Sequence, residues 1–144
     1  MSNEEITLIV YGDPSAQKRH RHFARGKFHG TYDPSSNEKK DFLLMVQDKA
    51  PDKPFDCPLK VDMKFYFSHP KSHFGTGKNS NVLKASTPKL HIKRPDLDNC
   101  TKYILDSLNK VFWRDDSIIC HIEASKHYSI KPRVEIVIKI LSTK

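Results

Sequence analysis

The sequence predicts one α/β (α+β) domain: a mixed β-sheet of about four strands with two helices packed on one face, in the order β-α-β-loop-α-β-β. Residues 59–67 and 133–141 alternate apolar and polar side chains, as strands with one buried face do. Residues 36–50 and 98–110 repeat apolar side chains every three or four positions, which indicates amphipathic helices. No internal repeat or boundary between two cores is visible, so we expect a single domain over residues 1–144.

The first half of the chain is expected to form a strand and a helix. Residues 6–11 are apolar and end in Gly-Asp-Pro, a turn signal. The helix over 36–50 follows a capping box, in which Ser35 precedes Glu38 by three positions, and Pro51 ends it. The basic segment between strand and helix is expected to be a loop. The apolar positions at helical spacing are Phe42, Met45 and Val46.

The second half is expected to contain a strand, a long loop, a helix and two strands. About residues 68–95 lack periodicity, which predicts a long basic loop that orders only against a ligand. In the helix over 98–110, Asp98, Lys102 and Asp106 repeat every four residues on one face. Its core positions are expected to be Leu97, Thr101, Leu105, Leu108 and Phe112. Strands over residues 117–128 and 133–141, joined by a turn at residues 130–132, complete the sheet.

The positive charge is concentrated in two segments. The chain has 25 Lys and Arg against 17 Asp and Glu, a net charge of +8. Residues 14–32 contain five basic residues and residues 68–95 contain six, and neither segment contains an acid. With the eight histidines, this indicates a nucleic-acid partner rather than solvated loops kept charged for solubility. The residues expected to contact DNA are Lys18, Arg19, Arg21, Arg25, Lys27, Lys93 and Arg94.

Several other classes of protein are disfavoured. No run of eighteen apolar residues is present, so no membrane span is expected. Residues 1–5 are polar and acidic and lack the pattern of a secretory signal, which favours a cytoplasmic location. The three cysteines, Cys57, Cys100 and Cys120, lie far apart without metal-ligand spacing, so we expect reduced thiols that serve packing.

Acidic residues flank the second predicted helix, with Asp96 and Asp98 at its start and Asp115 and Asp116 after its end. Hard divalent cations such as Mg²⁺ prefer such oxygen ligands. The helix is about 18 Å long at 1.5 Å per residue, so Asp116 can approach Asp96 only if the chain doubles back along a strand beside it. Lys102, one turn beyond Asp98, can then stabilise charge on a phosphate.

Each of these residues also has a structural alternative. Asp98 can cap the helix, and Asp96 can interact with the helix dipole. Asp115 and Asp116 can form a solvated turn, and Lys102 can pair with Asp98 at i,i+4 spacing. The acids alone therefore leave both a metal site and a set of structural roles open.

The ordered combination of these residues resembles the D-x-D-N…K…D-x-L…W-x-D-D pattern of RusA-type Holliday-junction resolvases. The matching segments are Asp96-Leu97-Asp98-Asn99, Lys102, Asp106-Ser107-Leu108-Asn109 and Trp113-Arg114-Asp115-Asp116. The segment Pro132–Ile136 also resembles their last strand. Residues 17–21 resemble the basic K-x-R-P-R-type segment after the first strand of many members, with His20 where proline is usual.

This resemblance implies a homodimer that binds branched DNA, specifically four-way junctions, and makes paired nicks with Mg²⁺ or Mn²⁺. By position, the metal-binding acids of the family fall on Asp96, Asp98 and Asp116, the essential lysine falls on Lys102, and Asp115 is a possible additional ligand. No small-molecule substrate is implied, and a phage or prophage is a natural setting. The loop over about 68–95 is longer and more basic than in shorter members, so the resemblance implies no role for it.

The hypothesis that follows is Mg²⁺-dependent hydrolysis of DNA at the acidic cluster, with a metal-bound water as nucleophile. Two alternatives remain open. The chain can be a non-catalytic nucleic-acid-binding module whose acids only cap a helix and form a turn. It can also be a metal nuclease that prefers other branched DNA, such as flaps or forks.

Overall fold

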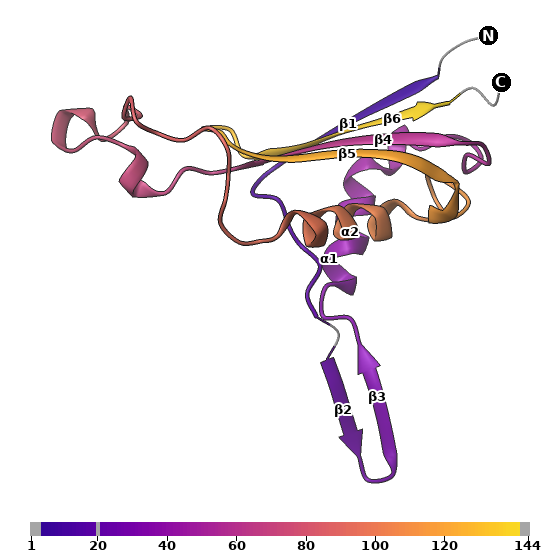
Figure 1. Ribbon diagram of the computed structural model, residues 1–144. Helices are drawn as coiled ribbons and strands as arrows, with labels where there is room; N and C mark the ends of the chain where they lie inside the picture. Colours follow the sequence, from indigo (N-terminus) through magenta and orange to yellow (C-terminus); the bar gives the residue numbers. More distant parts are fainter. Residues whose placement is uncertain (1–3, 20, 142–144) are drawn as a thin grey trace.

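The computed structural model describes residues 4–19 and 21–141. Two α-helices, α1 (Ser36–Val46) and α2 (Leu97–Leu108), cover one face of a four-stranded sheet (Figure 1). The strand order is β1 (Glu5–Tyr11), β6 (Arg133–Ile140), β4 (Leu59–Phe67), β5 (Ile119–Tyr128). β6 is antiparallel to both of its neighbours, and β4 pairs with β5 in parallel. This mixed sheet confirms the predicted fold class. Residues 1–3, used in the argument about a secretory signal, and His20 lie outside the described residues.

The helix α1 (Ser36–Val46) is shorter than predicted, because residues 47–49 form a 3₁₀ turn. The predicted capping box is wrong. Ser35 occupies the N-cap position, but its fully buried hydroxyl accepts a hydrogen bond from the backbone N–H of Lys18 at 3.1 Å. Glu38 instead accepts from Lys18 Nζ at 3.1 Å. The start of α1 therefore anchors the basic segment that precedes it.

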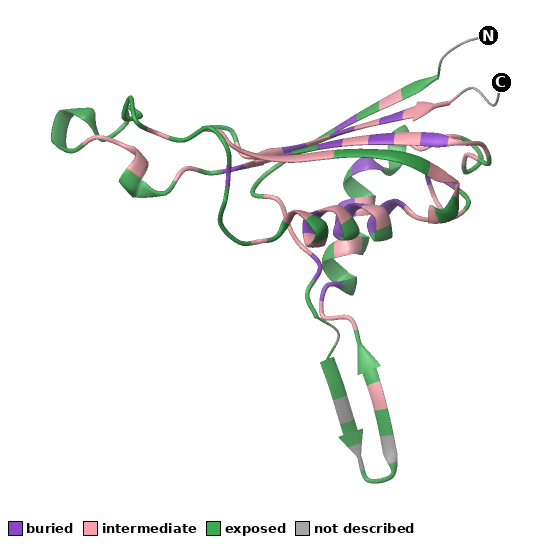
Figure 2. Ribbon diagram, viewed as in Figure 1, coloured by how far each residue is buried: buried purple, intermediate pink, exposed green. Residues whose placement is uncertain are grey.

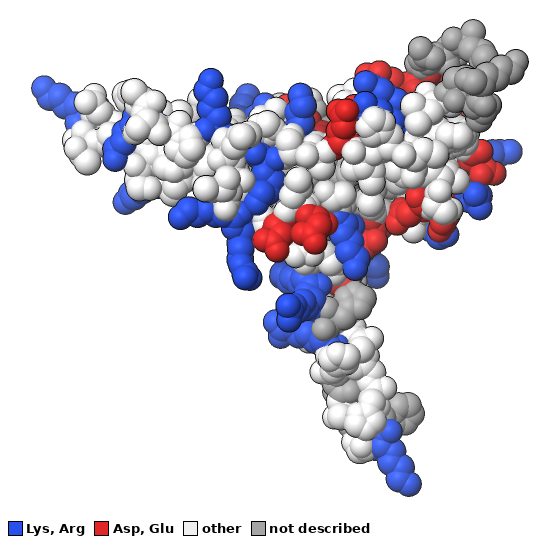
Figure 3. Space-filling view, in the orientation of Figure 1, with Lys and Arg blue, Asp and Glu red and all other residues white. Residues whose placement is uncertain are grey.

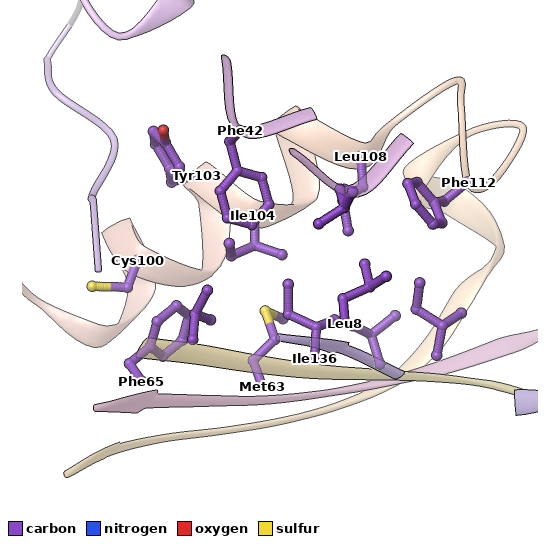
Figure 4. Packing of buried hydrophobic residues seen from close by; sticks show 14 of the residues in the cluster. Leu8, Phe42, Met63, Phe65, Cys100, Tyr103, Ile104, Leu108, Phe112 and Ile136 are labelled. Carbon is purple, nitrogen blue, oxygen red and sulfur yellow. The ribbon is translucent and has the colours of Figure 1, made fainter. Parts of the chain in front are cut away.

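The core lies between the sheet and the helices (Figures 2 and 4). The alternation predicted for β4 and β6 is confirmed, since every second side chain is buried throughout β4 and from Val134 to Ile138 in β6. Met45 is 64% exposed, contrary to prediction. The helix α2 (Leu97–Leu108) buries Cys100, Tyr103, Ile104, Ser107 and Leu108. The predicted core stripe is confirmed at Leu108 and Phe112, which are fully buried. Its other members, Leu97, Thr101 and Leu105, are only half-buried, and Tyr103 packs edge-on against Phe42 instead.

The basic segment was expected to be a loop, but much of it forms a hairpin. β2 (Arg21–Arg25) and β3 (Phe28–Tyr32) pair in antiparallel fashion and project away from the helices (Figure 1). Gly26 adopts a φ of +58° in the connecting turn, which glycine tolerates without steric cost. The hairpin lies apart from the core between the sheet and the helices (Figure 1), so its sequence need not show the alternation of a half-buried strand.

Residues 68–94, here called the basic arm, extend beyond the ends of β4 and β5 (Figure 1). The arm contains short turns and backbone pairing rather than an α-helix or a strand of the sheet. Two 3₁₀ turns, Lys71–His73 and Gly77–Asn79, occur in it. Backbone hydrogen bonds of 2.9 Å join Gly75 N–H to Val82 O and Lys84 N–H to His73 O.

The strands β5 and β6 are consecutive in the chain but do not pair, because β4 lies between them. The linker that joins them crosses the end of β4, where Ser129 N–H donates to Phe67 O at 2.9 Å. β5 is therefore an edge strand, and it begins at Ile119, after a 3₁₀ turn at Asp116–Ile118. No helix in the described part of the chain combines the length and apolar character that a bilayer crossing needs.

Candidate active site

The chain reverses direction after α2 and brings Asp116 back beside it. Lys110 adopts a φ of +72°, the left-handed conformation that commonly ends a helix, and its backbone N–H donates to Trp113 O at 2.8 Å. The Trp113 side chain is fully buried and fixes the turn to the core. The return along a strand beside the helix, which a shared acidic site requires, is thus present.

A pocket lies between α2 and β5, and its charged lining is formed by Asp98, Lys102, Asp106 and Asp116. The first three share a face of α2 because they are spaced four residues apart. Leu105 and Ala124 contribute apolar side chains to the lining. In Figure 3, acidic side chains over α2 lie between the basic surfaces of the arm and the hairpin base. The pocket therefore combines carboxylates with a lysine at a place that a polyanion can approach.

Asp116 is the least exposed carboxylate of the pocket. Burial raises the pKa of Asp116, and the nearby Asp106 and Asp115 raise it further. The indole N–H of Trp113 donates to Asp116 Oδ1 at 2.7 Å and opposes this rise. The carboxylate is thus held in one orientation in surroundings where its negative charge is costly.

Asp96 lies outside this pocket. It is the N-cap residue of α2, in place of the Asp98 considered above, and its side chain makes no capping hydrogen bond. It lines a neighbouring cleft with Lys18, Arg94 and Asn99. Asp98 and Asp116 therefore line one pocket, whereas Asp96 lines the neighbouring cleft. Within residues 4–19 and 21–141, no three His, Cys, Asp or Glu side chains lie close enough to form a ready-made metal site.

Asp115 has a structural role in the turn before β5. Its carboxylate accepts from Lys110 Nζ and from the backbone N–H of Ser117, each at 3.0 Å. The Ser117 hydrogen bonds, followed by Lys110, lower the pKa of Asp115. It does not line the pocket with Asp116, so the two adjacent acids have different surroundings.

Asp106 is the pocket residue that the sequence-based site assignment left out. Its Oδ2 accepts from Lys39 Nζ at 3.1 Å, and the same ammonium donates to Asp33 Oδ2 at 2.6 Å. The Lys39 side chain is only 11% exposed. The signal for Asp106 was its spacing of four from Lys102 and eight from Asp98, which places all three on one helix face.

Lys102 is exposed on α2, and within the described part of the chain it takes part in no ion pair. The alternative i,i+4 pair with Asp98 is therefore not formed. Its ammonium remains available to an anion that enters the pocket.

The loop that leads into α2 is held by Lys126 of β5, a residue without an assigned role in the sequence analysis. Lys126 Nζ donates to the backbone oxygens of Lys93 and Pro95, at 2.6 Å each. The intervening Arg94–Pro95 peptide bond is cis. Lys126 therefore positions the segment that carries Asp96.

The expected DNA-contacting residues divide between two places. Lys18 and Arg19 line a cleft with Asn99 and Lys102 at the base of the hairpin, although Lys18 also pairs with Glu38. The others lie on β2 (Arg21, Arg25), in the hairpin turn (Lys27) and at the end of the basic arm (Lys93, Arg94). Basic residues thus lie on two sides of the acidic pocket.

A mixed α+β fold whose acidic pocket lies between basic surfaces is suited to a protein that acts on nucleic acid. The family model of endodeoxyribonuclease RusA matches residues 12–139, and the chain belongs to this family of Holliday-junction endonucleases. The chain is also 36% identical over 140 residues to the uncharacterized protein YqaN of Bacillus subtilis (strain 168), a match that covers 95% of this chain and 97% of that protein. The resemblance noted in the sequence is thereby confirmed.

Proposed function

We propose that the chain resolves Holliday junctions by paired phosphodiester hydrolysis that depends on Mg²⁺ or Mn²⁺, at the pocket between α2 and β5. The observation that carries this proposal is that Asp98 of α2 and Asp116, which precedes β5, line one pocket with Lys102 and Asp106. The family match supports junction cleavage in general, and the pocket supports its location.

The residues of the pocket fit a hard divalent cation. Carboxylate oxygens are the donors that Mg²⁺ prefers. Burial and two neighbouring acids raise the pKa of Asp116, so a cation would offset a repulsion that the fold maintains. Asp98 and Asp116 would hold the ion with Asp96, as the family pattern implies. When bound, such an ion lowers the pKa of a coordinated water and polarises the phosphodiester.

The other residues would bind and orient the DNA. Lys102 lies in the pocket with no carboxylate partner among the described residues, and it would stabilise negative charge on the cleaved phosphate. The β2–β3 hairpin is a two-stranded ribbon, a shape that the major groove admits. Contacts from Lys18, Arg19 and Arg21 to phosphates would give affinity that falls with salt and carries little sequence information.

A homodimer would supply two such sites. A four-way junction is nearly two-fold symmetric, and an isologous dimer places its two sites about the same kind of axis. Paired nicks in opposite strands would follow from this symmetry.

The test is cleavage of a synthetic four-way junction by the wild-type protein and the Asp98→Asn variant, with Mg²⁺ or with a chelator. Asp98→Asn should bind the junction like wild type and lose at least about 100-fold in nicking rate, since it removes a charged metal ligand. Asp48→Asn, at an exposed position in the turn after α1, is the matched control and should nick normally. The proposal would be contradicted if Asp98→Asn nicked the junction at the wild-type rate, or if the wild-type protein nicked it equally fast in the presence of chelator. Faster cleavage of forks or flaps than of junctions would assign a different branched substrate.

A further inference from the structure

We propose that the basic arm binds the backbone of duplex DNA away from the cleaved strand, so that junction binding depends on the length of the duplex arms. This inference rests on the proposed function for its choice of DNA. It concerns a surface separate from the pocket of α2 and β5.

The charge of the basic arm is not neutralised within the protein. Residues 68–94 contain six Lys and Arg and no Asp or Glu. All six are exposed, and within the described residues none forms an ion pair. They are Lys71, Lys78, Lys84, Lys89, Lys93 and Arg94. Figure 3 shows these basic side chains spread along the arm with no acidic atoms among them. The arm therefore presents its charge to an external anion.

The arm is fixed to the sheet at both of its ends. At its start, the His69 ring stacks on Tyr128, with centroids 5.2 Å apart. Near its end, the buried His91 stacks on Phe67 at 4.1 Å, and its backbone N–H donates to Lys126 O at 3.2 Å. Tyr128 N–H donates to Lys89 O at 2.9 Å. These contacts define the direction in which the arm leaves the sheet.

The outer part of the arm also has internal contacts. Phe74 and Leu83 form an antiparallel bridge, which is flanked by the Gly75–Val82 and Lys84–His73 backbone hydrogen bonds. Thr87 Oγ1 donates to His73 O at 3.0 Å. The lysines are thus carried on an ordered segment, which reduces the ordering entropy that binding costs.

The position of the arm favours duplex DNA as the partner. The arm extends past the ends of the strands, whereas the hairpin projects from the helix side, and α2 lies near the place where the two diverge (Figure 1). When one strand of a junction is bound in the pocket, the duplex arms of that junction would run toward the basic arm and the hairpin. Duplex DNA presents one phosphate charge per about 1.7 Å of axis, a density that several separated cations can contact together.

The experiment compares junctions with short and with long duplex arms, about 8 and about 25 base pairs, at several salt concentrations without divalent metal. The variant is Lys71→Gln/Lys78→Gln/Lys84→Gln. The control is Lys40→Gln/Lys49→Gln/Lys53→Gln, which makes the same change in net charge at exposed residues outside the arm. Binding is measured by fluorescence anisotropy, and nicking is measured separately with Mg²⁺.

Wild type and the control should bind the long-armed junction at least about tenfold more tightly than the short-armed one. The arm variant should lose this preference while binding the short-armed junction normally. Its salt slope on the long-armed junction should fall by up to about 2.7, since each phosphate contact contributes about 0.9. Equal effects of the arm and control variants, or an unchanged length preference in the arm variant, would overturn the proposal. Normal length dependence without any nicking by wild type would sink only the proposed function.

Discussion

The indole Nε1 of Trp113 donates a 2.7 Å hydrogen bond to Oδ1 of Asp116, so a fully buried ring of the core holds one carboxylate of the candidate active site. A donor on the carboxylate favours its charged form, whereas burial and the neighbouring acids favour the neutral form. The ionisation of Asp116 therefore depends on a contact made by the core.

Replacing Trp113 by Phe should move the acid limb of the pH–nicking profile to higher pH by about one to two units. The lost hydrogen bond to a charged group is worth roughly 1.5–3 kcal/mol, and one pKa unit corresponds to about 1.4 kcal/mol. The pKa of Asp116 is already raised, and the substitution raises it further. Phe112→Leu, at a buried position without a polar contact in the described structure, is the control for lost packing and should leave the limb in place. An unmoved limb in Trp113→Phe would show that Asp116 does not titrate in the reaction.

Asp33 should make the stability of the protein depend on pH in the acidic range. Burial alone would raise its pKa, but hydrogen bonds from Lys39, Ser35 and Gln17 outweigh burial and lower it from 3.8 to about 2. Its stabilisation is therefore present above about pH 4 and is lost as pH falls toward 2. Asp33→Asn should lower the free energy of unfolding by on the order of 2 kcal/mol at pH 7. Urea unfolding at several pH values should show this gap closing between pH 4 and pH 2, and a gap independent of pH would refute the assignment.

Lys126→Met should lower stability and slow nicking. The substitution keeps the length of the side chain but leaves the backbone oxygens of Lys93 and Pro95 without their donor, at a cost of about 1–3 kcal/mol. Lys64→Met, an exposed lysine of β4, serves as the control. Lys126→Met should have a lower melting temperature and a lower rate of junction nicking than Lys64→Met. Equal melting temperatures would indicate that Lys126 does not hold the loop.

The core should respond to Ile136→Ala with a loss of about 2–5 kcal/mol in the free energy of unfolding, because this side chain is fully buried in β6. Ile9→Ala removes the same atoms from a residue of β1 that is 45% exposed, and its effect should stay below about 1 kcal/mol. Denaturant unfolding of both variants measures the difference. Similar losses would mean that the outer face of β1 is covered in solution.

The sequence predicted those parts of the fold that alternate strictly or repeat at helical spacing. β4 and β6 were found because one face of each is buried, which leaves a period of two in the sequence. The order of the strands could not be found in this way, because the placement of β4 between β5 and β6 depends on contacts distant in the chain. The β2–β3 hairpin was missed because it lies apart from the core, so burial of one face did not impose a period of two on its sequence.

The candidate site was predicted in part. Asp98, Lys102 and Asp116 do line one pocket, since the turn after α2 returns the chain as the acidic pattern required. Asp96 was expected beside them, but α2 begins one residue earlier than predicted and leaves Asp96 at its N-cap. The contact of Lys39 with Asp106 and the contacts of Lys126 with Lys93 and Pro95 carried no local signal, because these partners lie far away in the sequence.

The single ammonium of Lys39 serves Asp33, at the base of the hairpin, and Asp106, in the pocket. A ligand that draws Asp106 away from Lys39 changes the contact between Lys39 and Asp33 at the hairpin base. Conversely, a ligand that shifts the hairpin base changes the charge around Asp106. Such an effect must be reciprocal and equal in free energy in the two directions. The binding of DNA at the hairpin and the binding of an ion among the carboxylates would therefore be energetically coupled.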